Sequence, residues 1–565
     1  MQNATQQIPN AVLHLYIILY ILKTKQMQKP SFKKPLAGVV IALALLLCSA
    51  ITYAQDAVQQ NYVKFGQLLR LVNSYYVDSA DIEKLTENAI VNMLGELDPH
   101  SIYISKEDVE RMNEPLQGNF EGIGISFNIF KDTLLVTSII SGGPSEKAGL
   151  LAGDRIVEID QKNIAGTGIK NSDVQSLLRG KRGTTVGLKV IRKPENELLG
   201  FTVVRDRIPI YSLEASYMLD ESTGFIKLSN FSATTMEEFM EAMNELKKQN
   251  IKNLVLDLRE NTGGYLNTAI NITDQFLKNN KMIVYTDGQN ERQREYKSTS
   301  SGTFMDGNLV VLVDESSASA SEIVSGAIQD WDRGLIIGRR TYGKGLVQRP
   351  FPLTDGSVVR LTTAHYYTPS GRCIQKPYDG GVAEYRQELR NRSINGEMLS
   401  ADNISVIDSL AYKTLVNGRT VFGGGGIVPD IFIPRDTSSH YQYVNQFNRN
   451  NIIYSYVLGY IDGNRQQLLE NYNEFEKFNA DFTVTDEMID ELVALGEKEG
   501  IRRNEESLNF AGNEFKKEIK SLIARDLFTR NEFYKVYYKN DEAILKALDV
   551  IKNQSQYDKL LVSKD

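Results

Sequence analysis

The stretch Val310-Val-Leu-Val-Asp-Glu-Ser-Ser-Ala-Ser-Ala-Ser-Glu-Ile-Val-Ser-Gly-Ala-Ile-Gln-Asp330 joins an apolar run to a serine-rich turn, which continues into a run with helical apolar spacing. This order predicts a buried strand that enters a helix through a tight turn. Gly343-Lys-Gly-Leu-Val-Gln348 follows as a loop in which glycines flank a lysine. A serine at a helix N-terminus with an amine near it offers a nucleophile and a base. The two stretches therefore predict a candidate catalytic site.

Strand and helix patterns alternate on both sides of that stretch. The apolar runs Gly224–Leu228, Leu254–Leu258 and Leu335–Gly338 have the near-continuous character of strands in a parallel sheet. Helical apolar spacing separates the first two of these runs. We therefore expect residues 209–436 to form an α/β core with crossover helices.

The rest of the chain divides into further regions. Residues 55–114 have helical spacing, and residues 115–208 show short alternating strands punctuated by glycines. Residues 437–565 are charged and helical, and residues 377–410 are interpreted as a hydrophilic insertion or mobile loop. The predicted fold is multidomain α/β and β, with helical N- and C-terminal regions around the core and an inserted β domain.

Residues 1–54 have the order of an export signal. Basic residues between Lys29 and Lys34 precede the apolar run Leu36–Ile51, and small residues up to Ala54 provide a cleavage site. Met27 is then the expected start, with an upstream extension before it. We expect a periplasmic or other extracytoplasmic location, or inner-membrane anchoring if the signal stays uncleaved.

Composition excludes several other classes of site. The chain has 565 residues and a net charge of −7, which gives no support for a general nucleic-acid surface. Cleavage after Ala54 leaves Cys373 as the one cysteine of the mature chain, so neither an intrachain disulfide nor a cysteine-based metal site is expected. The chemistry expected at the serine needs no metal or cofactor.

Ser319 is the candidate nucleophile, although a serine-rich helix cap is the ordinary reading of such a turn. Lys344 acts as a base only if burial lowers its pKa, and a solvated loop lysine is the ordinary alternative. Gln348, four residues further on, is placed to orient the amine by a hydrogen bond. Asp257-Leu-Arg-Glu-Asn-Thr-Gly-Gly264 ends a buried strand in a glycine turn, where N–H groups can bind an oxyanion together with Ala320.

Two other kinds of site have partial matches in the sequence. Gly338-Arg-Arg-Thr-Tyr-Gly-Lys344 matches most of a phosphate-binding loop, but Gly345 stands where the pattern requires serine or threonine. A Ser-His-Asp triad would need a histidine base, and His365 in a predicted strand is the one plausible candidate. Both readings are disfavoured.

Taken together, these motifs resemble the carboxyl-terminal processing peptidases, or tail-specific proteases. The resemblance rests on the two stretches quoted first, on the glycine turn ending at Gly264, on Tyr366-Tyr-Thr-Pro-Ser-Gly-Arg372 and on Leu97-Asp-Pro-His-Ser101. It covers residues 60–435 and includes a segment, 115–208, that looks like a PDZ domain. It implies a Ser/Lys endopeptidase that recognises apolar C-terminal tails in the cell envelope.

The resemblance also implies roles for individual residues. Ser319 would be the nucleophile, Lys344 the general base and Gln348 the residue that orients it. Asp330 matches a supporting acid, and Gly263 or Gly264 with Ala320 matches the oxyanion hole. In the PDZ-like segment, Phe120-Glu-Gly-Ile-Gly124 would bind a terminal carboxylate, with the peptide adding a strand to the sheet. The predicted peptide-binding residues are Phe120, Gly122, Ile123, Gly124, Ile125, Val174, Leu178 and Arg179.

Protein substrates bound by their C-terminal tails are the expected partners. A homodimer and an envelope adaptor or regulator are further expected partners, and nucleic acid is not. Two alternatives to an enzyme stay open from the sequence: a catalytically silent PDZ scaffold, and a dimeric adaptor built from the terminal helices.

Overall fold

The computed structural model describes residues 57–193 and 197–562 and divides into two units, residues 1–89 and 90–565. The first unit contains a helix over residues 57–75 and most of helix α3 (Ile82–Gly95). The predicted signal lies outside the described residues. None of the helices described is long and apolar enough to cross a membrane.

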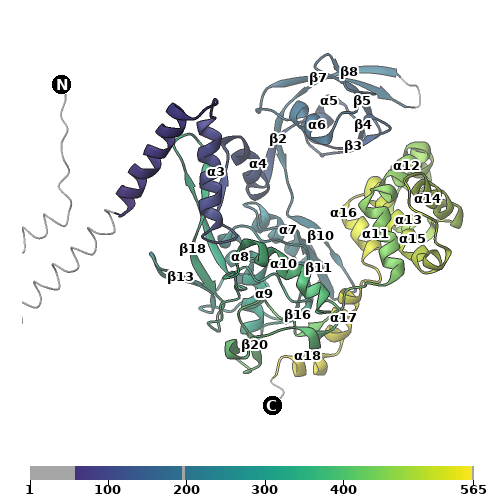
Figure 1. Ribbon diagram of the computed structural model, residues 1–565. Helices are drawn as coiled ribbons and strands as arrows, with labels where there is room; N and C mark the ends of the chain where they lie inside the picture. Colours follow the sequence, from purple (N-terminus) through teal and green to yellow (C-terminus); the bar gives the residue numbers. More distant parts are fainter. Residues whose placement is uncertain (1–56, 194–196, 563–565) are drawn as a thin grey trace, which may run out of the picture. The chain divides into compact units, whose positions relative to one another are not determined.

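A six-stranded sheet forms the centre of the second unit (Figure 1). Its first two strands are antiparallel and all the later neighbours are parallel. In spatial order the strands are β10 (Leu213–Met218), β11 (Thr223–Leu228), β12 (Asn253–Asp257), β15 (Asn308–Val313), β16 (Leu335–Gly338) and β21 (Ile431–Phe432). The α/β core predicted from the apolar runs is therefore present.

Helices cover both faces of this sheet. Helices α7 (Thr235–Lys248), α8 (Leu266–Asp274) and α9 (Ala320–Asp330) share one apolar cluster with one set of alternate strand residues. Helices α17 (Glu542–Lys552) and α18 (Gln554–Leu560) share a second cluster with the other set. Both faces are buried, which explains the near-continuous apolar runs of the strands. The end of the region predicted as a separate C-terminal part thus belongs to the core.

A second sheet carries one of the candidate catalytic residues. Strand β18 (Val358–Tyr367) pairs with β1 (Ile102–Ile104), β13 (Met282–Gly288) and β17 (Leu346–Pro352), and β14 (Glu291–Lys297) pairs with β13. Strand β17 follows the lysine loop directly, so its third residue, Gln348, lies beside that loop.

A β domain lies within the predicted range of residues 115–208, with its sheet between residues 125 and 204. Its sheet has the path β3 (Ile125–Phe130), β4 (Thr133–Ile139), β5 (Arg155–Ile159), β7 (Thr185–Arg192) and β8 (Glu197–Val204), with β6 (Lys162–Asn163) paired to β5. Helices α5 (Pro144–Ala148) and α6 (Asn171–Leu178) complete it. A two-stranded ribbon of β2 (Asn119–Gly122) and β9 (Asp206–Pro209) joins the domain to the chain around it, after helix α4 (Lys106–Gln117).

Residues 377–410 differ from the expected insertion or mobile loop. They contain helix α10 (Gly381–Ile394) and the short 3-10 helices η1 (Ala401–Asn403) and η2 (Asp408–Leu410), which precede the hairpin of β19 (Ala411–Lys413) and β20 (Thr420–Phe422). Tyr385 and Arg392 of α10 are buried. Most polar side chains of α10 are exposed, as the hydrophilic composition suggests, but the buried Arg392 binds backbone carbonyls of the core.

The C-terminal region is helical, as predicted. Helices α11 to α16 build an apolar cluster of their own, separate from those of the central sheet. Their bounds are α11 (Ser439–Arg449), α12 (Ile452–Asn471), α13 (Phe475–Asp481), α14 (Asp486–Lys498), α15 (Glu505–Leu527) and α16 (Arg530–Tyr537).

Candidate active site

Ser319 lies in the sharp turn between β15 and α9, directly before the helix. Its φ of 55° and ψ of −110° are strained for a residue that is not glycine. Ala320 follows as the first helical residue, so its N–H has no partner within the helix. The strained turn therefore places the serine next to a free helix N-terminus, as the sequence predicted.

Glu322, in the first turn of α9, holds this turn and the lysine loop together. Its fully buried carboxylate accepts the N–H of Ser319 at 2.8 Å, of Gly343 at 2.7 Å and of Lys344 at 2.9 Å. The Thr341 hydroxyl donates to it at 2.5 Å. Sequence reasoning did not assign Glu322 a role, although its position three residues after Ser319 is that of a capping-box glutamate.

Lys344 is largely buried, and burial is the main cause that lowers the pKa of its amine, with Arg360 adding to the effect. Its Nζ donates to Gln348 Oε1 at 3.1 Å. The Tyr366 hydroxyl donates to the Lys344 carbonyl at 2.6 Å and lies 3.1 Å from the Ser319 carbonyl. Among the described hydrogen bonds none joins Ser319 Oγ to Lys344 Nζ. The environment is thus the one a lysine base needs.

Gln348 is oriented by the segment Asp98–Ser101. Its Nε2 donates to the carbonyl of His100, so its Oε1 faces the lysine amine. The Asp98 carboxylate fixes the carbonyl by accepting the N–H groups of His100 at 2.7 Å and Ser101 at 2.8 Å. The sequence analysis assigns His100 no role of its own. The motif Leu97-Asp-Pro-His-Ser101 was the available signal.

The imidazole of His100 is itself close to the site. Its Nε2 lies 2.8 Å from the Tyr385 hydroxyl of α10, and burial followed by the charge of Lys344 lowers the pKa of His100 to about 4. The ring is therefore neutral at pH 7. His365, the histidine considered from the sequence, instead lies 3.9 Å from the Cys373 sulfur. No hydrogen bond to Ser319 is described for either histidine.

Helix α10 supports the lysine loop from outside the core sheet. Arg392 donates to the carbonyls of Thr341 at 2.7 Å and Tyr342 at 3.2 Å, and Glu388 binds Arg392 at 2.5 Å. Glu388 also pairs at 2.9 Å with Lys376, whose N–H donates to the Gly343 carbonyl. The loop backbone is thus tied on one side to Glu322 and on the other to α10.

Replacing Arg392 by alanine is expected to lower kcat/KM about 10- to 100-fold, because two buried carbonyls of the lysine loop lose their donor. Arg390, on the exposed face of the same helix, is the matched control, and Arg390→Ala should leave kcat/KM unchanged. Hydrolysis of one peptide substrate by both variants, checked for folding by circular dichroism, measures this. Equal activities of the two variants would show that α10 does not position the loop.

The glycine turn lies against Ser319. A Cβ on Gly263 would come within 2.8 Å of Ser319 Cβ and 3.0 Å of the Ala320 nitrogen. The N–H of Gly263 donates to Asn261 Oδ1 at 2.9 Å, whereas no described partner accepts the N–H of Gly264. Gly264 and Ala320 are therefore the better pair of oxyanion donors.

Asp330 lies at the opposite end of α9 from Ser319, about 16 Å along the helix axis. Its buried carboxylate pairs with Arg372 at 2.7 Å and accepts the N–H of Ser370 at 2.9 Å. Any support that Asp330 gives to Ser319 is therefore indirect, through the loop that follows β18.

The structure also disfavours a phosphate-binding loop at Lys344, because Lys344 leads into strand β17 and not into a helix.

In the PDZ-like domain, the predicted peptide-binding residues lie either in the apolar cluster and on strand β3 or in the loop between β2 and β3. Ile123, Val174 and Leu178 are buried in the apolar cluster of the domain, and Ile125 is half-buried on strand β3. The loop between β2 and β3 contains Gly124 at a φ of 76°, which favours glycine. This loop precedes an edge strand, since β3 pairs with β4 and with no other strand in the part of the chain that the structure describes.

Arg179, the C-cap of α6, contacts residues outside the main sheet of the domain. It pairs with Glu114 of α4 at 2.6 Å and lies 4.8 Å from the centre of the Phe120 ring. The backbone of Arg179 also lies 3.9 Å from the site of a Cβ built on Gly122. A contact between Arg179 and a bound peptide would therefore run through Phe120 in the carboxylate loop.

The fold and this site together define a class: an α/β hydrolytic enzyme with a strained serine at a helix N-terminus and a PDZ-like domain inserted before its core. Residues 222–384 match peptidase family S41, and residues 135–192 match the PDZ domain. Residues 443–529 match a family of unknown function.

Curated relatives extend over most of the chain. The carboxy-terminal-processing protease of Bartonella bacilliformis is 37% identical over 346 residues, which cover 60% of this chain and 79% of the relative. The carboxy-terminal processing protease CtpB of Bacillus subtilis is 35% identical over 317 residues, or 55% of this chain and 65% of the relative. The chain therefore belongs to peptidase family S41 and is a serine peptidase. This membership disfavours the silent scaffold and the adaptor.

Two solved structures are also similar. The photosystem II D1 C-terminal processing protease is 28% identical, with a TM-score of 0.32, over 55% of this chain and 89% of that one. The PDZ domain of the carboxy-terminal protease of Vibrio cholerae, solved in complex with a peptide, is 30% identical, with a TM-score of 0.15, over 16% of this chain and 97% of that one.

Proposed function

We propose that this chain is a carboxy-terminal processing endopeptidase in which Ser319 is the nucleophile and Lys344 the general base. The observation that carries the proposal is the shared carboxylate of Glu322, which binds the backbone N–H groups of both residues. Burial of the amine and its bond to Gln348 add support, since a lysine base must be neutral and oriented.

In the proposed mechanism, neutral Lys344 takes the proton of the Ser319 hydroxyl as its oxygen attacks the scissile carbonyl. The N–H groups of Gly264 and Ala320 stabilise the oxyanion. Protonated Lys344 then gives its proton to the leaving amine, and an acyl-enzyme remains. Lys344 next takes a proton from the water molecule that attacks the ester. It then gives this proton to the Ser319 oxygen as the bond to the acyl group breaks, which releases the product acid and restores the neutral amine. A direct bond between the two side chains would form when substrate binds.

The PDZ domain would capture the substrate by its C-terminus. An extended apolar tail would pair with the free edge of β3, with its carboxylate at the loop formed by residues 120–124. Its side chains would reach the apolar residues of β3 and α6. Val174 and Leu178 are buried in the apolar cluster of the domain, so the half-buried Ile125 is the more accessible of these apolar residues.

The proposal also includes export of the chain to the periplasm and its assembly with a second copy or an adaptor. Export to the periplasm rests on the basic, apolar and small-residue order of residues 1–54. A homodimer is supported by the helix over residues 57–75, on which Tyr62 is 73% and Leu68 54% exposed. Such an apolar helix gains stability when it packs on a second copy or on an envelope adaptor.

The test compares residues 55–565 with the Ser319→Ala and Lys344→Ala variants, each incubated with a partly unfolded protein carrying an apolar or a charged C-terminus. Cleavage by the unsubstituted chain alone, favouring the apolar tail, is the expected result. If the Ser319→Ala variant cleaved the substrate as fast as the unsubstituted chain, Ser319 would not be the nucleophile. If substrates with apolar and charged C-termini were cleaved equally, the proposed specificity for apolar tails would be wrong, but the proposed role of Ser319 would not be affected.

The pH dependence tests the lysine base. Since the pKa of Lys344 is lowered in the folded chain, the neutral, active form should accumulate as pH rises through that lowered value. We expect kcat/KM to rise with pH and to level off below the ordinary pKa of lysine. Lys344→Arg, which stays charged, should be inactive at every pH. A rise that persists in the Lys344→Arg variant would assign the titration to another group.

A further inference from the structure

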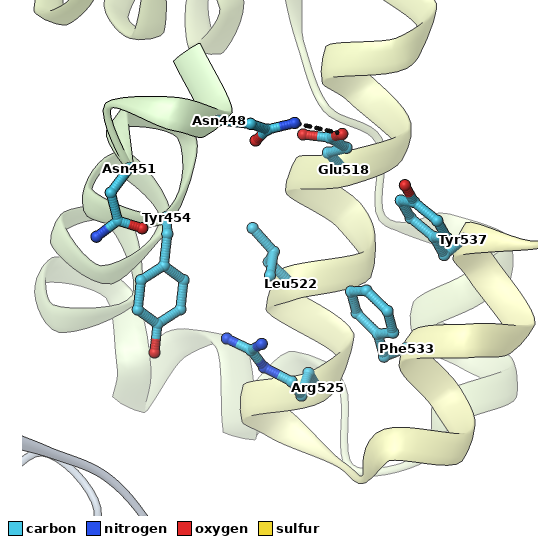
Figure 2. A pocket seen from close by; sticks show the side chains of 8 residues that line it. All are labelled: Asn448, Asn451, Tyr454, Glu518, Leu522, Arg525, Phe533 and Tyr537. Carbon is cyan, nitrogen blue, oxygen red and sulfur yellow. Dashed lines mark hydrogen bonds between the residues drawn. The ribbon is translucent and has the colours of Figure 1, made fainter. Parts of the chain in front are cut away.

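The C-terminal helical region contains a cavity that the proposed mechanism does not use. It has a volume of about 400 Å³ and lies between helices α11, α12, α15 and α16 (Figure 2). This volume falls within the range of small-molecule and cofactor sites. The residues that line it come from, and directly follow, the segment that matches a family of unknown function.

One end of the cavity presents a cation. Arg525 of α15 has its guanidinium 5.0 Å from the centre of the Tyr454 ring and 6.0 Å from that of Phe533. Rings on both sides hold an arginine in place while its N–H groups stay available. Among the described residues no carboxylate forms an ion pair with Arg525 and no acceptor takes its N–H groups. This end therefore suits a planar anion such as a carboxylate.

The other end presents a carboxyl group. Glu518 lies seven residues before Arg525 on α15, which is about 10 Å along the helix axis. Asn448 of α11 donates to Glu518 at 2.9 Å, as Figure 2 shows. Burial raises the pKa of Glu518. This hydrogen bond leaves the second carboxyl oxygen for an N–H group of a ligand.

The middle of the cavity is apolar. Leu522 stands between Glu518 and Arg525 on the same face of α15, because residues four and seven positions apart align on a helix. Phe533 and Tyr537 of α16 form the facing wall, with their rings stacked at 5.3 Å. An apolar side chain can therefore rest between the two polar ends.

We propose that this cavity binds a short peptide whose free carboxylate meets Arg525, whose apolar side chain meets Leu522 and Phe533, and whose amino end meets Glu518. Three extended residues span about 10 Å, which matches the separation of the two charged side chains. A serine peptidase releases peptides of this chemistry, so the site would bind a product of the reaction. The proposal rests on the peptidase activity for the origin of the ligand, but not for its binding.

The test uses residues 55–565 with Ser319→Ala to prevent turnover and Phe533→Trp as a reporter at the cavity wall. Trp331 is the one natural tryptophan of the chain, so the Ser319→Ala parent without the reporter is the blank. The probe is Ala-Leu-Ala with a free carboxylate, compared with its C-terminal amide and its N-acetyl form. We expect a saturable change in emission with the free peptide and at least tenfold weaker binding of the amide.

Arg525→Gln should weaken binding of Ala-Leu-Ala at least tenfold, whereas Arg502→Gln, at an exposed arginine of the same region, should leave it unchanged. Calorimetry on the Ser319→Ala parent, which lacks the Phe533→Trp reporter, and on its Leu522→Phe variant, which fills the cavity, repeats the test without the reporter. Thermal unfolding confirms that each variant folds. Equal binding of acid and amide, or no loss with Arg525→Gln, would overturn the proposal.

The N-acetyl form and a carrier protein ending in Ala-Leu-Ala distinguish the source of the peptide. Weaker binding of both, relative to the free peptide, supports a site for released products. Binding of the carrier protein as tightly as the free peptide would overturn the contact between Glu518 and the amino end. A failure of this test leaves the cleavage test of Ser319 and Lys344 unaffected, because the two use different variants and readouts.

Discussion

Replacing Glu322 by alanine is expected to lower kcat/KM at least about a hundredfold and the free energy of unfolding by about 4 kcal/mol. The carboxylate accepts three backbone N–H groups and one hydroxyl inside the core. Each buried donor left without an acceptor costs about 1–3 kcal/mol, and relaxation of the site recovers part of the sum. Two of these donors are the N–H groups of Ser319 and Lys344, so the proposed nucleophile and the proposed base lose their common acceptor.

Glu238 of α7 provides the matched control. It is also a buried glutamate in the first turn of a helix, and it accepts the N–H groups of Ser212 at 2.7 Å and Leu213 at 2.8 Å. Glu238→Ala should therefore lose comparable stability but keep its kcat/KM while folded. Urea unfolding gives the stability of both variants, and peptide hydrolysis at a temperature where both are folded gives the activity. Full activity of folded Glu322→Ala would contradict the positioning role.

The catalytic candidates could be predicted because their signal is local. Ser319 stands in a strand–turn–helix pattern, and Lys344 and Gln348 lie four residues apart on one loop and strand. The glycine turn was also found from local sequence, because positive φ angles and close approach require glycine at Gly263 and Gly264. Short-range patterns of this kind depend little on the rest of the fold.

The residues that position the site could not be predicted in the same way. His100 reaches Gln348 across more than two hundred residues of sequence, and Arg392 of α10 reaches the lysine loop through a segment that looked like solvent-exposed insertion. Every residue has a backbone carbonyl, so a hydrogen bond to one cannot be predicted from the identity of the accepting residue. Polarity alone did not distinguish a charged side chain that binds buried carbonyls from one that stays in water.

The sheet shows the same limit. The near-continuous apolar runs predicted a parallel sheet with crossover helices, but not which helices cover each of its faces. In β15, Val311 and Val313 face the cluster with α9, while Val310 and Leu312 face the cluster with α17. More than two hundred residues separate β15 from α17, so strand periodicity could not identify the helix. The layer predicted as part of a separate C-terminal region belongs to the core.

Replacing Ala547 of α17 by aspartate is therefore expected to unfold the peptidase core, not just the C-terminal end of the chain. Ala547 is fully buried in the cluster that includes Val310 and Leu312 of the central sheet. A carboxylate there has no partner in the cluster, and its burial costs about 4 kcal/mol or more, a large part of the stability of a domain. Tyr557 of α18 binds the backbone of Leu309 through its hydroxyl, so loss of the layer also removes these hydrogen bonds from β15.

Leu545→Asp is the control on the same helix, because Leu545 is 48% exposed and its substitution should change the free energy of unfolding by less than about 0.5 kcal/mol. Urea unfolding followed by circular dichroism, with peptidase activity measured in parallel, compares the two variants. We expect Ala547→Asp to lose both its cooperative transition and its activity while Leu545→Asp keeps both. If Ala547→Asp retained an active core and melted only its terminal helices, the second face of the sheet would not depend on α17, and the chain could be shortened before α17 without loss of the catalytic fold.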